Sequence, residues 1–146
     1  MKVAVIEAKK SYEADEVPIG AVIVKDGKII AKAHNTRNKT QNAINHAEVL
    51  VISKACKKLK SWRLDDCDIY VTLEPCPMCA GAILNARIKN LYFGAYDKTG
   101  SSNLLKTIMT DNRLNHKTNL TGGIMEEECG KLLSDFFSEK RGNKKE

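Results

Sequence analysis

The spacing of hydrophobic positions changes several times along the chain, which predicts an alternation of helices and strands. The first 15 or so residues favour a helix, because Val3 and Ile6 lie three apart among helix-forming residues. Apolar runs at 20–24 and 29–33 flank a turn at Asp26-Gly27 and predict a β-hairpin. Residues 34–45 are polar and predict a loop.

The middle of the chain predicts two helices and two strands. A helix is expected from His46 to about Lys60, with an apolar face made of Val51, Ala55, Leu59 and Trp62. Residues 68–73 predict a strand and 77–87 a helix, which has a proline in its first turn. Residues 90–95 predict the next strand.

The last third of the chain is expected to hold one long helix. We expect a long loop after residue 95, a short strand within 118–125 and a helix over 126–140. The apolar face of this helix consists of Cys129, Leu132, Leu133, Phe136 and Phe137. The resulting order predicts an α/β protein with three layers, α/β/α, around a mixed central sheet of about five strands.

Composition narrows the class of protein. With 146 residues, 42% of them hydrophobic, the chain predicts one globular domain over 1–137 and a charged C-terminal tail over 138–146. No apolar run approaches the roughly 18 residues of a membrane span, and no signal peptide is visible, so we expect a cytoplasmic protein and no membrane partner. Lys and Arg number 24 against 18 Asp and Glu, and this net charge of +6 permits a polyanionic partner.

The cysteines point to a metal site. There are five, an odd number, and only Cys76 and Cys79 lie close together. They open a helix directly after a strand, and His46 opens the preceding helix. A right-handed crossover brings two such helix starts to one edge of the sheet. Two thiolates and one imidazole, with a fourth position left for water, form the pattern of catalytic zinc sites.

Glu48 supplies a candidate proton carrier beside this metal. It lies two residues after His46, close enough to reach a metal-bound water without ligating the ion. Zinc lowers the pKa of such a water towards ~7, and a neighbouring carboxylate can take its proton and pass it to a ring nitrogen and a leaving amine. This pairing suits hydrolytic deamination of an amino-purine or amino-pyrimidine.

Other interpretations stay open at this point. The two cysteines could form a redox pair. A structural zinc site could instead recruit a fourth ligand from Cys56, Cys67 or Cys129, in a protein that binds RNA without chemistry. Metal analysis separates the first alternative from an enzyme, and the activity of a Glu48→Ala variant separates the second.

The motifs also resemble those of a known family. His46-Ala-Glu48 followed by Pro75-Cys76-Pro-Met-Cys79 resembles the signature of the zinc-dependent nucleobase deaminases, whose fold is cytidine deaminase-like. Further stretches resemble the bacterial tRNA-specific adenosine deaminases: EVPIGAV at 16–22, YVTLEPCPMCAGA at 70–82, FGA at 93–95, DKTG at 97–100 and LLSDFF at 132–137.

The resemblance implies conversion of adenosine to inosine at the wobble position of a tRNA anticodon, by a homodimer with one Zn²⁺ per subunit and the anticodon stem-loop as partner. It implies zinc ligands at His46, Cys76 and Cys79, a proton shuttle at Glu48, a base contact at Asn35, and anticodon-loop contacts at Phe137, Lys140 and Arg141. The family pattern tends to Arg at position 140, where this chain has Lys. A zinc-dependent deaminase of a free base or nucleotide, such as guanine, is the alternative.

Overall fold

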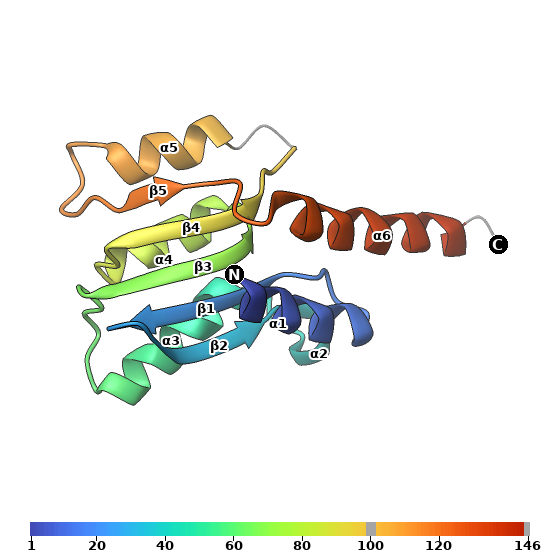
Figure 1. Cartoon of the computed structure of the whole chain (residues 1–146), viewed down its shortest axis with the longest axis horizontal. Coiled ribbons are helices and arrows are strands. Elements are labelled where there is room, and N and C mark those ends of the chain that lie inside the picture. The colour runs from blue at the N-terminus through green and yellow to red at the C-terminus, as the bar shows by residue number, and fades with distance from the viewer. Residues whose placement is uncertain (99–101, 145–146) are drawn as a thin grey trace.

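Five strands form one mixed sheet in the computed structural model, which describes residues 1–98 and 102–144 (Figure 1). The strands are β1 (Gly20–Lys25), β2 (Lys28–His34), β3 (Cys67–Leu73), β4 (Asn90–Ala95) and β5 (Asn119–Thr121). Their order is β2-β1-β3-β4-β5. β1 is antiparallel to both of its neighbours, whereas β3, β4 and β5 run parallel. The predicted mixed sheet is confirmed.

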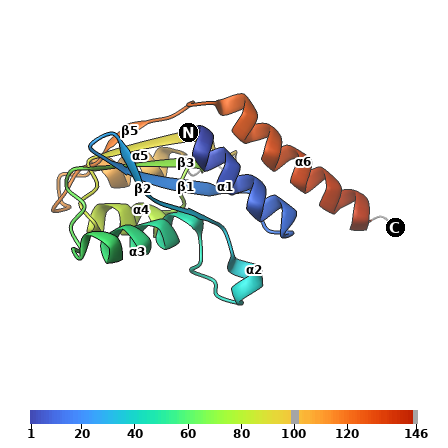
Figure 2. The same cartoon turned by 60° about the horizontal axis from the view of Figure 1, so that its bottom comes forward.

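Helices cover both faces of this sheet. They are α1 (Lys2–Glu13), α2 (Arg37–Thr40), α3 (Ala47–Leu59), α4 (Pro77–Asn85), α5 (Ser102–Thr110) and α6 (Glu126–Lys144). α1 and α6 lie on one face and α3 and α4 on the other (Figure 2). α5 packs beside α4 and adds Leu105 and Met109 to the same core. The α/β/α layering is confirmed.

Two glycines allow the N-terminal half to pack as it does. Asp26 and Gly27 both have positive φ, 51° and 75°, which is the geometry of a type I′ hairpin turn. Gly20 lies directly under α1, where an added Cβ would meet the carbonyl oxygen of Ala4 and approach the backbone nitrogen of Ala8 to 2.6 Å. α1 can therefore lie close to β1 only because residue 20 has no side chain.

The structure corrects three expectations. The predicted loop at 34–45 contains the short helix α2. The loop predicted after residue 95 contains α5, whose buried Leu105 and Met109 lie four residues apart among polar neighbours that hide the helical period. Trp62 does not belong to the apolar face of α3. That helix ends at Leu59, the next residue adopts a left-handed conformation, and the Trp62 side chain is 60% exposed. Its ring contacts Arg63, whose guanidinium carbon lies 5.4 Å from the ring centre.

α6 continues to Lys144 and projects beyond the sheet (Figure 1). The predicted division at 137/138 falls inside this helix, and that functional boundary stays a prediction. α1 supports the projecting turns: the Tyr12 ring meets the Phe136 ring edge-on at 5.7 Å, and the Tyr12 hydroxyl donates to Glu139. Residues 145–146 of the predicted tail, and 99–100 of the DKTG motif, lie outside the described residues.

Within the described ranges, no helix combines the length and apolar character that crossing a membrane requires.

Candidate functional site

Two helix N-termini carry the candidate metal ligands. His46 and Cys76 are the N-cap residues of α3 and α4, both with extended backbone, and neither side chain caps its own helix. Pro77 fixes the first turn of α4, which places Cys79 one turn further along. The imidazole and both thiols are therefore free to face one another at the edge of the sheet.

The three ligand atoms lie close together. His46 Nδ1 is 3.7 Å from Cys76 Sγ and 3.6 Å from Cys79 Sγ, and all three atoms lie within 4.8 Å of one another. Tetrahedral zinc, with Zn–S bonds of about 2.3 Å and Zn–N bonds of about 2.0–2.1 Å, separates nitrogen from sulfur by about 3.6 Å. The donor types and their spacing fit a zinc ion.

The remaining cysteines take no part in this cluster. In the portions of the chain that the structure describes, His46, Cys76 and Cys79 form the single group of three possible ligands. Cys67 and Cys129 are buried in the two hydrophobic clusters, and all five thiols are free. The set of three protein ligands leaves room for a fourth, exogenous ligand, as catalytic sites do.

The two thiols titrate differently. Hydrogen bonds from the Cys79 thiol and from the first backbone N–H groups of α4 lower the pKa of Cys76 to about 5, so this sulfur is a thiolate at neutral pH. The hydrogen bond that the Cys79 thiol donates to the Cys76 thiolate raises the pKa of Cys79, and burial raises it further. Metal binding therefore has to release the proton of Cys79.

Glu48 lies beside these thiols in the first turn of α3. Its side chain is only 3% exposed, and burial raises its pKa. The carboxylate accepts a hydrogen bond from Cys79, while Oε1 has no hydrogen-bond partner among the described residues. A buried carboxylate with an unpartnered oxygen is a ready acceptor for a proton or for a polar group of a ligand.

Asn35 is held close to the same helix start. Its carbonyl oxygen accepts a hydrogen bond from the buried Ser11 hydroxyl at 2.8 Å, and the next residue donates its backbone N–H to Asn45 at 3.1 Å. The side-chain amide is buried, with Nδ2 directed at Val17 O at 3.4 Å. Its Oδ1 has no partner in the described portions of the chain. The predicted base-contacting residue therefore offers a free acceptor.

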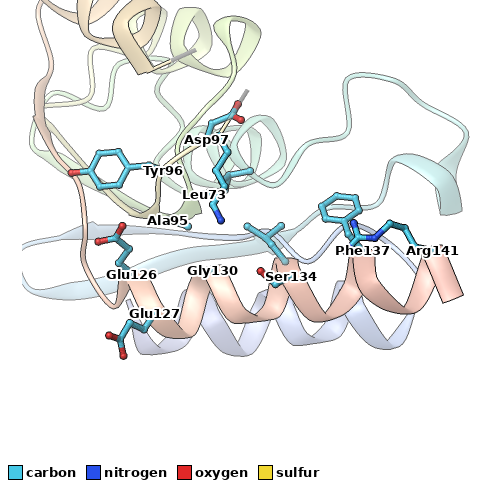
Figure 3. Close-up of a pocket in the computed structure, with 12 residues that line it drawn as sticks. Leu73, Ala95, Tyr96, Asp97, Glu126, Glu127, Gly130, Ser134, Phe137 and Arg141 are labelled. Atoms are coloured by element: carbon cyan, nitrogen blue, oxygen red, sulfur yellow. The ribbon is translucent and has the colours of Figure 1, made fainter. Parts of the chain in front are cut away.

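A groove of about 840 Å³ lies between the ends of β3 and β4 and the helix α6 (Figure 3). Leu73, three residues before Cys76, lies in its wall. Phe137 and Arg141 line one end, and Tyr96 and Glu126 the other. Of the two phenylalanines on the predicted apolar face of α6, Phe136 is buried, whereas Phe137 is 44% exposed. The groove thus runs from the projecting end of α6 to the end of β3, and none of the three metal ligands lines it.

The predicted contact residue Lys140 lies elsewhere. Its Nζ is 2.5 Å from Asp15 Oδ1 and 5.6 Å from the centre of the Phe136 ring, and it does not line the groove. Sequence reasoning also missed residues that do line it, among them Tyr96, Lys98, Gly130 and Ser134. The sequence does contain a signal that could have identified part of this lining. Its members on α6 recur at the helical spacing i, i+4, i+7 and i+11, which places them on one face: Gly130, Ser134, Phe137 and Arg141.

Comparison with known proteins agrees with this geometry. The family model of the MafB19-like deaminases matches residues 1–141. A tRNA-specific adenosine deaminase of Bacillus subtilis is 53% identical over 99% of this chain and 91% of that protein. A tRNA-specific adenosine deaminase of Aquifex aeolicus is 43% identical over 98% of this chain and 95% of that protein.

Two solved structures of deaminases also match this chain. One from a study of A-to-I editing by tRNA:A34 deaminases at the wobble position of transfer RNA superposes with a TM-score of 0.85, at 42% identity, over 91% of this chain and 97% of that one. A guanine deaminase from Bacillus subtilis matches over 65% of this chain and 61% of that one, with a TM-score of 0.62 and 47% identity. The chain belongs to the MafB19-like deaminases, and among them to the tRNA-specific adenosine deaminases.

Proposed function

We propose that this enzyme hydrolyses adenosine to inosine at the wobble position of a tRNA anticodon. The observation that carries the proposal is the His46, Cys76 and Cys79 cluster beside the unpartnered oxygen of Glu48. It occurs in a chain whose full length matches tRNA-specific adenosine deaminases. The reaction consumes one water and releases one ammonia, because the exocyclic amine of adenine leaves as a carbonyl oxygen takes its place.

His46, Cys76 and Cys79 would hold one Zn²⁺ per subunit, since two thiolates and an imidazole suit zinc better than harder ions. When bound, zinc lets a water ionise near neutral pH and so supplies the nucleophile. Glu48 would carry one proton of the attacking water to the ring nitrogen, and would then carry the second proton of the same oxygen to the amine that leaves as ammonia. Its burial keeps the transferred proton from solvent and raises its pKa, which brings this carboxyl nearer the range of a useful proton carrier.

Asn35 would read the edge of the adenine. A base that reacts at a ring carbon has to leave the stack and is then recognised by hydrogen bonds to its edge. The free Oδ1 of Asn35 is an acceptor, and its Nδ2 is a donor held only by a long contact of 3.4 Å to Val17 O. The amide can therefore serve both kinds of group on a purine.

The groove beside α6 would hold the neighbouring nucleotides of the anticodon loop. Single-stranded loops are bound by stacking on aromatic rings and by cations. Exposed Phe137 offers the ring, and Arg141 at the same end offers the cation. Lys140 lies against Asp15 and would reach RNA only after leaving that ion pair.

The resemblance also supports a homodimer, and the site has apolar surface that a second copy could cover. Ile44, two residues before His46, is 53% exposed, and Met78, between the two cysteines, is 38% exposed. Analytical ultracentrifugation of the zinc-loaded protein tests the homodimer. A single species of 16.2 kDa, the mass of one chain, would contradict it. An enzyme of tRNA would work in the cytoplasm, where we place this one.

The decisive experiment is incubation of the zinc-loaded protein with a tRNA pool, followed by sequencing for A-to-I change at the first anticodon position. A Glu48→Ala variant should retain metal and tRNA binding but lose nearly all inosine formation. Free adenine and guanine serve as competing substrates. The partial match to a guanine deaminase makes guanine the second candidate, and comparable turnover of free guanine would overturn the proposal.

A further inference from the structure

The positive charge of this protein is concentrated in one segment. Residues 27–64 contain nine of the 24 Lys and Arg residues but only one of the 18 Asp and Glu residues. That single acid is the buried Glu48. The rest of the chain then holds 15 Lys and Arg against 17 Asp and Glu, so the whole positive excess of the protein comes from this segment.

These cations are exposed and, with one exception, unpaired. Eight of them have exposed side chains and form no salt bridge with any described residue: Lys28, Lys32, Arg37, Lys39, Lys54, Lys57, Lys58 and Lys60. The ninth, Arg63, is paired with Asp65. Elsewhere, Lys10, Arg113 and Lys131 each pair with a nearby carboxylate. Ala31 and Ala33 pack with α3, whereas His34 lies 3.8 Å from Glu7 of α1, so the side chain of Lys32 lies on the α1 face of the sheet. We call the other seven unpaired residues the α2–α3 basic band.

The fold arranges the band as a path that starts at the catalytic site. Arg37 and Lys39 lie on α2, in the loop that joins Asn35 to His46. Lys54 lies half-way along α3, and its Nζ donates to the backbone carbonyl oxygen of Lys32 at 3.0 Å, so the middle of this helix lies against β2.

The far end of the path follows from the strand and helix directions. β2 begins at the hairpin turn and ends at the site, while α3 begins at the site and ends near that turn (Figure 1). Lys28 therefore lies at the same far end as the lysines of the last turn of α3. The 13 residues of α3 span about 20 Å.

Stabilisation of helix α3 explains the positions of only some of these cations. Lys57 and Lys58 lie in the last turn of α3, where cations interact favourably with the helix dipole. That effect fades within one turn, so it does not explain Lys54 or the two cations of α2. Concentrating unpaired like charges on one face carries a cost in mutual repulsion, which a polyanion bound there would remove.

We propose that the α2–α3 basic band binds the phosphate backbone of the RNA substrate outside the anticodon loop, along the stem. This inference rests on the proposed function, which places the loop in the site where the band begins. The groove and the band lie on different elements, because the groove is lined by the ends of β3 and β4 and by α6, while the band follows α2 and α3. The loop would lie in the groove while one strand of the stem follows the band.

The test compares two double variants of equal charge change. Lys54→Gln with Lys58→Gln removes two charges of the band. Lys2→Gln with Lys9→Gln removes two exposed lysines of α1, on the opposite face of the sheet. Each is measured with intact tRNA and with an anticodon hairpin whose stem is cut to the shortest that still closes the loop. Thermal unfolding of each variant checks that the fold is kept.

The band variant should bind intact tRNA more weakly, and the slope of log K against log salt should fall by about 1–2, the share of two phosphate contacts. The KM for tRNA should rise with kcat unchanged. The band variant should bind the short hairpin as tightly as the unmodified enzyme does. The α1 variant should bind and deaminate both RNAs as the unmodified enzyme does. The inference would be overturned if the band variant lost equal affinity for both RNAs or lost none. It would also be overturned if the α1 variant lost as much affinity for tRNA as the band variant.

Two other outcomes are distinguishable. Unchanged tRNA binding combined with lost retention on immobilised polyglutamate would assign the band to an acidic protein and overturn the RNA assignment. If the unmodified enzyme forms no inosine in tRNA, the proposed function itself is wrong. If it forms inosine and the band variant behaves like it, only the present inference is wrong.

Discussion

The buried carboxylate of Glu74 accepts a hydrogen bond from the backbone N–H of Asp97 at 2.9 Å. Glu74 also donates its own backbone N–H to Ala95 O at 2.9 Å. It lies two residues before Cys76, so one side chain joins the segment that carries the thiols to the segment that forms one wall of the groove. The metal ligands and the groove are therefore fixed relative to one another.

Replacing Glu74 should disturb substrate binding more than metal binding. Glu74→Ala leaves the Asp97 N–H without this acceptor, which costs about 1–3 kcal/mol of unfolding free energy, and frees the groove wall to move. We expect a raised KM for tRNA with near-normal zinc content, measured by steady-state kinetics and metal analysis. Glu74→Gln keeps an acceptor oxygen and should restore most of the KM. Loss of zinc in both variants would show that Glu74 supports the ligands instead.

Removing the metal should abolish activity without unfolding the chain. The ligands sit at the ends of helices that are packed by their own apolar faces, so the fold does not depend on them. We expect a chelator to remove about one zinc per chain, with unchanged far-ultraviolet circular dichroism and a lower Tm, because an ion that binds only the folded state stabilises it. Cys76→Ser should give the same result without the chelator. A metal-free chain that loses its helical signal would contradict this.

Ser11 should act on the substrate through Asn35. Its buried hydroxyl donates to the Asn35 carbonyl, so Ser11→Ala should cost about 1–3 kcal/mol of unfolding free energy and raise KM more than it lowers kcat. Urea unfolding and kinetics check the two effects. Ser53→Ala, on the exposed face of α3, is the matched control and should change the unfolding free energy by less than about 0.5 kcal/mol. Equal effects of the two substitutions would remove the role of Ser11.

Cys129 should make stability fall at alkaline pH. Burial raises the pKa of its thiol to about 11, above its ordinary value of 9.0. The folded chain then keeps a proton that the unfolded chain releases, so stability declines as the pH rises above 9. Urea unfolding should show a loss of about 1 kcal/mol by pH 10 relative to pH 7, beyond the loss in a Cys129→Ala variant. Parallel pH profiles of the two proteins would contradict this.

Much of the site could be predicted from the sequence because its chemistry is local. His46, Cys76 and Cys79 each open a helix or lie in its first turn, so residue type and spacing together placed them at one edge of the sheet, where the structure brings them together. The hairpin turn at Asp26-Gly27 could also be predicted from the sequence, because few residue pairs adopt the positive φ angles that this turn needs.

The rest depends on contacts between distant parts of the chain. The hydrogen bond from Asp97 to Glu74 spans 23 residues and leaves no periodic signal. The helix α5 was hidden because only two of its residues are fully buried in the core. Trp62 looked like a core residue, but a left-handed residue at Lys60 ends the helix before it, and a backbone conformation of that kind has no strong signature in a lysine.

The projection of α6 beyond the sheet separates two tasks in one small enzyme. Its outer turns touch α1 and the groove but none of the metal ligands. Residues there can change over evolutionary time, or in a designed library, without passing strain to the reaction centre. If α6 holds the anticodon loop as proposed, exchanging a few of its solvent-facing side chains should alter which nucleic acids the enzyme accepts while the chemistry stays as it is.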